Sequence, residues 1–122
     1  MRLPVLAFAA TLFFAGLAYA HAPPVGVNGG RQVDAGEYHV EMVVEGSALT
    51  IYVRDHSDRP VTTTGFRGTA ILALPGRAER FALEPAGDNR LKGTSSVPLP
   101  ARPRGAVQIT TRAGGTIQGR FN

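Results

Sequence analysis

The chain has 122 residues, contains no cysteine and no tryptophan, and carries a formal net charge of +4 at pH 7. Without cysteine, disulfide bonds and thiolate metal ligands are excluded, so the fold must be held together by packing. The basic residues form no run or stripe and are not interleaved with the few aromatic residues, which argues against nucleic-acid binding.

The beginning of the chain has the pattern of a secretory signal peptide. Arg2 precedes an apolar run from Val5 to Leu17, and the small residues Ala18 and Ala20 form an A-x-A cleavage pattern. The run is about a dozen residues long, whereas a helix needs roughly 20 to span a bilayer. We therefore expect export to the periplasm, and a protein that is not embedded in the membrane after cleavage.

Cleavage at this pattern defines the expected organisation of the chain. A cut after residue 20 leaves His21 at the N-terminus, and the alternative cut two residues earlier leaves Tyr19. We expect a signal peptide (1–20), a flexible arm rich in proline and glycine (21–30) and a single β-sandwich domain (31–122).

Two runs of alternating apolar residues within Tyr38–Asp55 predict a β-hairpin. They flank Gly46-Ser47, and glycine at the first central position suits a two-residue type II′ turn. This turn pairs apolar residues on the core face and polar residues on the other, solvated face. The expected apolar pairs are Val44–Leu49, Met42–Ile51 and Val40–Val53, and the expected polar pairs are Glu41–Tyr52 and His39–Arg54.

The rest of the chain also predicts an all-β fold, because no segment keeps helical spacing. Short strands at this spacing indicate a small antiparallel β-sandwich, Ig-like or barrel-like, of about seven to eight strands. The proline-rich segment Val97–Gly105 is expected to cross between the two sheets or to form an edge, because proline cannot donate a ladder hydrogen bond. Further strands are expected at 31–34, 61–64, 69–74, 80–84, 90–93, 106–111 and 116–121.

The sequence contains no catalytic motif, so we expect a protein that is not an enzyme. It has no G-x-S-x-G elbow, no phosphate loop and no dinucleotide fingerprint. His56 and Ser57 are adjacent in a predicted turn, whereas the residues of a catalytic triad converge in space.

The three histidines, His21, His39 and His56, are the candidate metal ligands. An N-terminal His21 offers its α-amino group and its ring nitrogen, and such a chelate suits Cu(II) or another divalent transition metal. A second histidine from the sheet completes a three-nitrogen site. The alternative is that His21 is an unliganded tail residue, His39 a solvated strand residue and His56 a turn residue.

Two segments resemble a group of small exported proteins and domains of Gram-negative bacteria. The run GGRQVDAGEYHVEMVVEGSALTIYVRDHSDRP (Gly29–Pro60), followed by Val61, is similar to a pattern of His-Gly-Gly, a Tyr-His-Val-Glu-like strand, a Leu-Thr-hydrophobic-Tyr strand, Asp, a turn and Pro-Val. LEPAGDNRLKG (Leu83–Gly93) is similar to a second segment of the group, Leu-x-Pro-x-Gly-x-Asn-x-Leu-x-Gly. Related segments occur with periplasmic adaptor subunits of copper-type, heavy-metal RND efflux systems. The resemblance implies a small β-sandwich and a role in handling copper or a related metal.

The chain departs from this group at one position that bears on metal binding. Asn28 stands where the group has the histidine of His-Gly-Gly. Either Asn28 is simply a turn residue and this metal role is lost, or, as our hypothesis, the role is transferred to His21, whose arm would fold back toward His39.

Two functions follow from these observations. The first is a periplasmic accessory that binds copper or another divalent metal, with a component of a metal efflux system as its partner. The second is a metal-free module for protein–protein interaction in the periplasm. Such a module would dock through a sheet edge or through the polar face that carries Glu41, Tyr52 and Arg54.

Overall fold

The structure, a computed structural model, describes Arg2 and residues 24–122. The signal peptide expected over 1–20 and the candidate ligand His21 lie outside the described residues, apart from Arg2. In the described part the chain forms eight antiparallel strands and no helix that is long and apolar enough to cross a membrane. The strands are β1 (Arg31–Ala35), β2 (Tyr38–Glu45), β3 (Ala48–Asp55), β4 (Arg67–Leu74), β5 (Arg77–Pro85), β6 (Arg90–Thr94), β7 (Arg104–Thr110) and β8 (Thr116–Phe121).

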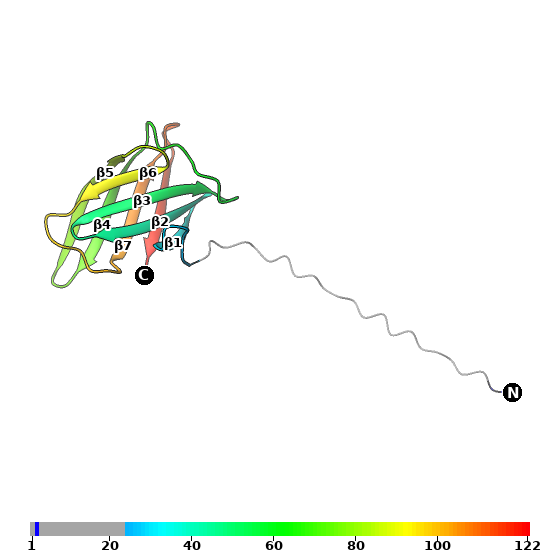
Figure 1. The fold of residues 1–122 in the computed structure, drawn as a ribbon, viewed down its shortest axis with the longest axis horizontal. Coiled ribbons are helices and arrows are strands. Elements are labelled where there is room, and N and C mark those ends of the chain that lie inside the picture. Colours follow the sequence, from blue (N-terminus) through cyan, green and yellow to red (C-terminus); the bar gives the residue numbers. More distant parts are fainter. Residues whose placement is uncertain (1, 3–23) are drawn as a thin grey trace.

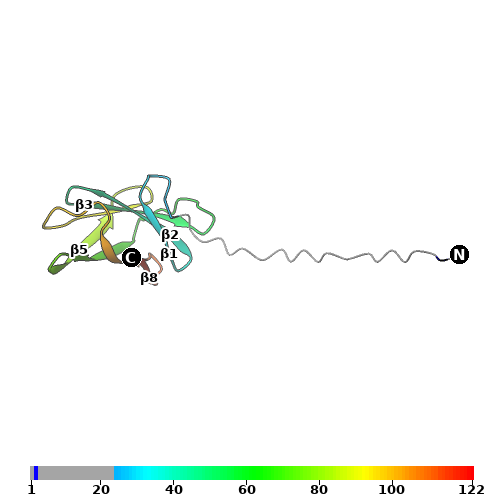
Figure 2. The same ribbon diagram turned by 90° about the horizontal axis from the view of Figure 1, so that it is seen from below.

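The strands form one sheet in the order β1-β2-β3-β6-β5-β4-β7-β8, which curls into a nearly closed barrel (Figure 1). The two edge strands, β1 and β8, lie side by side. Figure 2 shows the barrel flattened, with β3 along its upper side and β8 along its lower side. At Gly119 in β8, an added Cβ would lie only 2.7 Å from Val40 and 3.1 Å from Val33, so the two edges meet where a side chain is missing. The expected all-β fold is confirmed, in its barrel-like form.

The β2–β3 hairpin has the predicted register. Val40 pairs with Val53 and Met42 with Ile51, and all four side chains are buried. Gly46 has a φ of 61°, which suits the first central position of the predicted turn. The core is completed from the remaining strands by Ala70, Leu72, Leu83, Leu91, Val107, Ile109 and Phe121.

The strand expected at Val61–Thr64 is not formed, and that prediction was wrong. Pro60, which lacks an N–H group, makes only an isolated bridge with Arg54. Thr63 then turns toward another segment, because its backbone N–H donates to the carbonyl of Asp88 and its hydroxyl donates to the carbonyl of Arg90. These bonds fix the segment beside the loop between β5 and β6 rather than in the sheet.

The proline-rich segment crosses one end of the barrel and carries the chain from β6 to β7, which are strands of the same sheet, and its last two residues, Arg104 and Gly105, already belong to β7. We call residues 95–103 the crossing loop. Its beginning is tied to the β2–β3 turn, because Ser95 N donates to the carbonyl of Ser47 (2.8 Å) and Leu99 N to that of Gly46 (2.9 Å). Its end is held by Arg31, whose Nη1 donates to the carbonyl of Pro103 at 2.9 Å.

Candidate functional site

The outer face of the β2–β3 hairpin is buried, although the sequence predicted that it would be solvated. His39 and Arg54 are 5% and 6% exposed, and Glu41 is fully buried. The predicted cross-strand pairs themselves are correct, since His39 faces Arg54 and Glu41 faces Tyr52. The expectation of a solvated face was wrong because residues 24–30 and the turn after β3 fold over it.

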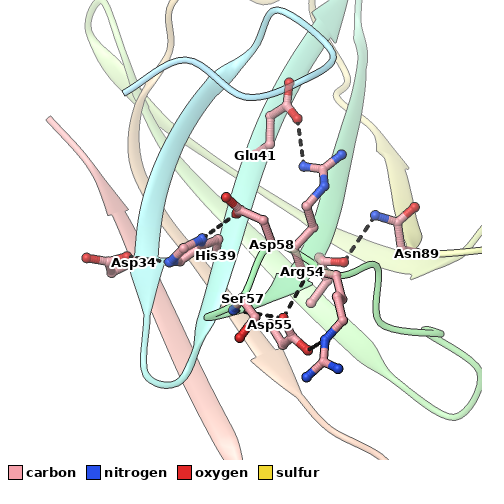
Figure 3. A network of polar contacts seen from close by, with 10 residues as sticks. Asp34, His39, Glu41, Arg54, Asp55, Ser57, Asp58 and Asn89 are labelled. Carbon is pink, nitrogen blue, oxygen red and sulfur yellow. Dashed lines mark hydrogen bonds and ion pairs between the residues drawn. The ribbon is translucent and has the colours of Figure 1, made fainter. Parts of the chain in front are cut away.

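Glu41 is the centre of this covered face (Figure 3). Its Oε1 accepts a hydrogen bond from Arg54 Nη1 at 3.1 Å, which makes a buried ion pair. Its two oxygens also accept from the backbone N of Asn28 (3.0 and 3.3 Å), from Asn28 Nδ2 (3.1 Å) and from the backbone N of Gly30 (2.8 Å). A buried charge is tolerated when it is paired and hydrogen-bonded in this way.

Residues 24–30, expected to belong to a flexible arm, are fixed against the sheet. The carbonyl of Pro24 accepts from Gln32 N at 3.1 Å, and Val25 makes a bridge with Arg31. An added Cβ at Gly26 would lie 2.1 Å from the Glu41 carboxyl carbon, so the segment passes directly over that side chain. Asn28, which replaces the histidine of the resembling group, uses its amide to bind Glu41.

His39 lies between two carboxylates (Figure 3). Its Nδ1 is 2.7 Å from Asp58 Oδ1, and its Nε2 is 3.4 Å from Asp34 Oδ1. Asp34 pairs with His39 across β1 and β2, whereas Asp58 comes from the turn that follows β3. The solvated strand histidine considered from the sequence is therefore a buried residue with two acidic neighbours.

The turn after β3 is organised by Asp55, and this places Asp58 over His39. Asp55 Oδ1 accepts from the backbone N of Ser57 (2.9 Å) and of Arg59 (3.0 Å), and Asp55 Oδ2 pairs with Arg59 Nε at 3.1 Å. The hydrogen bond from Arg59 N is the main cause that lowers the pKa of Asp55. Asp58 adopts a φ of 61°, a conformation that aspartate tolerates better than most residues.

The described residues do not form the predicted metal site. Both ring nitrogens of His39 already face a carboxylate, on opposite sides of the ring, so a single ion would not be held by all three groups. His56 is exposed in the turn after β3. In the range 24–122, no group of three or more His, Asp or Glu side chains is arranged to hold a metal ion. His21 lies outside the described residues, so its role stays a prediction.

A pocket of about 730 Å³ lies at the end of the barrel, where β4 and β8 end and β7 begins. The crossing loop and the β4–β5 turn form its rim. Its apolar wall is formed by Ile71, Leu72, Ala73, Pro75, Ala78, Pro100, Pro103, Ala106 and Phe121, and Arg102, Arg104 and Arg120 also line it. We call it the barrel-end pocket.

The charged side chains that line the barrel-end pocket are all arginines. Its three arginines are exposed, and none of them forms an ion pair with a carboxylate of residues 24–122. A smaller cavity of about 300 Å³ adjoins it through the shared residues Arg102 and Pro103, and is walled on its other side by residues 24–30. The site was not predicted from the sequence. The clustering of proline and arginine in residues 98–104 indicated an irregular, basic segment at this place.

Glu79, at the start of β5, holds the crossing loop in place beside this pocket. Its Oε1 accepts hydrogen bonds from Ser96 N (2.7 Å), Ser96 Oγ (2.7 Å) and Ser95 Oγ (3.1 Å). The bonds from Ser96 are the main cause that lowers the pKa of Glu79 from 4.5 to about 2. The carboxylate form of Glu79 is therefore the form that fixes the loop.

Comparisons of the chain with protein-family models, with curated proteins and with solved structures give no match. The function is therefore inferred from the geometry of these sites. The resemblance of residues 29–61 and 83–93 to domains of metal efflux systems stays a prediction.

Replacing Glu41 by alanine should destabilise the protein strongly, because it leaves the buried Arg54 without a partner charge. Breaking a buried ion pair from one side costs about 3–5 kcal/mol. We expect a fall of this size in the free energy of unfolding, measured by urea denaturation. Glu45→Ala removes an exposed carboxylate from the same strand and should change the value by less than about 0.5 kcal/mol. Equal small effects of both substitutions would contradict the role assigned to Glu41.

The lowered pKa of Glu79 should make stability depend on pH in the acid range. Because the pKa in the folded state is about 2 and the ordinary value is 4.5, the stabilisation is complete above pH 4.5 and is lost as the pH falls toward 2. Glu79→Gln removes this titration, so its free energy of unfolding should fall less steeply over this interval than that of the wild type. Glu84→Gln, at an exposed position of the same strand, should keep the wild-type slope. An unchanged slope in Glu79→Gln would show that this carboxylate does not anchor the loop.

Proposed function

We propose that this protein is an exported, periplasmic, non-enzymatic binding module that receives its ligand in the barrel-end pocket. The observation that carries this proposal is a mostly apolar pocket of about 730 Å³ with three arginines that lack a carboxylate partner among residues 24–122. Ligand sites in proteins are typically concave, mostly apolar and roughly 300–1,000 Å³ in volume, with a few polar groups that set orientation.

The pocket is held in shape by contacts that need no ligand. Leu99 N is bonded to the carbonyl of Gly46, Ser96 is bonded to Glu79, and Arg31 is bonded to the carbonyl of Pro103. The crossing loop is thus fixed at its beginning, middle and end. A preformed pocket avoids most of the entropy cost of ordering a loop upon binding.

The same proposal replaces the docking face that the sequence suggested. Glu41 and Arg54 were expected to offer a polar surface to a protein partner, but both side chains are buried under residues 24–30. Exposed arginines that have no carboxylate partner among residues 24–122 are instead found at the barrel-end pocket. We therefore place the proposed binding site at the end of the barrel and not on the hairpin face.

The proposal is tested with the neutral fluorescent probe N-phenyl-1-naphthylamine, whose emission rises in apolar sites. We expect saturable binding to the wild type, and an affinity at least about tenfold lower in Ala73→Trp, which fills the pocket with a bulky side chain. Ala82→Trp, on an exposed position of β5 outside the pocket, should bind the probe as the wild type does. Absence of saturable binding, or equal binding by Ala73→Trp, would contradict the proposed function.

A second candidate function is the copper-binding accessory of a heavy-metal efflux system that the resemblance implies. One observation favours it, namely the anchoring of Pro24 on Gln32 in β1. A chain that begins at His21 is three residues from this anchor and can extend roughly 10 Å beyond it. Asp34, which contacts His39, lies two residues further along β1, roughly 7 Å away. His21 is therefore within reach of Asp34. For His39 to bind the same metal ion, one of its ring nitrogens would have to lose its contact with a carboxylate.

This candidate is tested by titrating Cu(II) into protein that begins at His21, by calorimetry, before and after acetylation of the α-amino group. It predicts one-to-one binding that is lost on acetylation, because the α-amino nitrogen is one of the ligands. His39→Gln should weaken binding, whereas His56→Gln should leave it unchanged if the exposed turn is not involved. Weak binding that acetylation does not alter would rule out the terminal chelate.

A further inference from the structure

We propose that the barrel-end pocket is specific for amphiphiles with an anionic oxygen headgroup, a carboxylate or a phosphate monoester, on an apolar chain. This inference rests on the proposed binding function and adds the chemical class of the ligand. The observation behind it is the register of the sheet, in which apolar and cationic side chains lie next to one another at the pocket.

The register places apolar residues between arginines on one face of the sheet. One row across four strands runs Arg80, Ile71, Ala106, Arg120, and the next row contains Ala73 beside Arg104. Residues two apart on a strand share a face, so Arg104 and Ala106 point the same way, and Arg120 is diagonal to Arg104. The small side chains of Ala73 and Ala106 therefore leave space that is flanked by guanidinium groups.

These arginines are available to a ligand, in contrast to Arg31. Arg31 is bonded to the carbonyl of Pro103 and to the main-chain oxygen of Asn122, and its guanidinium lies over the Phe121 ring at 5.7 Å from the centroid. Arg104 and Arg120 have no carboxylate partner among residues 24–122. A guanidinium stays charged at all ordinary pH values and presents a fork of donors that matches carboxylate and phosphate oxygens.

The apolar part of the pocket indicates that the ligand also carries an apolar chain. Half-buried Ile71 and Ala106 and exposed Ala73 and Pro100 contribute accessible apolar surface to its lining. A free inorganic anion would satisfy the arginines but would leave this surface in contact with water. A ligand that carries both an anionic head and an apolar chain uses both parts, and a cationic head would be repelled.

The proposal is tested by displacement of N-phenyl-1-naphthylamine with four compounds below their micelle concentrations. These are decanoate, decyl phosphate, decanol and decyltrimethylammonium, which have different headgroups on linear chains of nearly equal length. An exposed ion pair contributes up to about 1 kcal/mol, equivalent to about fivefold in affinity. We therefore expect the anions to bind up to about fivefold more tightly than decanol, and the cation to bind most weakly. The tighter of the two anions identifies the headgroup.

Variants show whether the arginines of the pocket cause this preference. The double substitution Arg104→Gln/Arg120→Gln should reduce the affinity for decanoate to that for decanol and leave the affinity for decanol unchanged, which also shows that the pocket is intact. Arg67→Gln, at an exposed position at the start of β4, where the pocket has no lining residue, should keep the preference. Equal binding of decanoate, decyl phosphate and decanol to the wild type would overturn the anionic specificity while leaving the binding function in place. If the neutral probe itself does not bind, the binding function fails first.

Discussion

The buried carboxylate of Glu41 is the interaction on which the arrangement of the N-terminal half depends. It is paired with Arg54 across β2 and β3 and accepts hydrogen bonds from the backbone of Asn28 and Gly30. A fully buried carboxylate needs these donors, because an unpaired charge in the protein interior is strongly unfavourable. The segment 24–30 is therefore fixed as a cover over the hairpin, and it also forms one wall of the cavity that adjoins the barrel-end pocket.

The distribution of charge explains why the barrel-end pocket, and not the hairpin face, is the better candidate for binding. The carboxylates of Glu41, Glu79 and Asp55 are occupied by internal hydrogen bonds and ion pairs that hold the arm, the crossing loop and the turn after β3. The arginines that line the pocket have no such partners in residues 24–122. These three carboxylates are thus used for structure, and a set of basic groups remains at one end of the barrel to attract an anion.

The sequence was sufficient to predict the all-β fold and the register of the β2–β3 hairpin, because Gly46 and the alternation of apolar residues are local signals. It was not sufficient to predict what covers the other face. Asp58 and Asn28 reach His39 and Glu41 from 19 and 13 residues away, through turns whose path no periodicity encodes. The pocket was missed for the same reason, since its lining comes from four neighbouring strands, β5, β4, β7 and β8, and from two loops that meet only when these strands pair.

The most direct test of this account is amide hydrogen exchange at Asn28 and Gly30, measured by NMR in the wild type and in Glu41→Gln. The account predicts slow exchange of both amides in the wild type, because both donate to the buried carboxylate. It also predicts faster exchange of these amides in Glu41→Gln while core amides such as that of Ile51 stay protected. If Asn28 and Gly30 exchange in the wild type as fast as the exposed turn residue Gly76, the segment is not held by Glu41 and the account is contradicted.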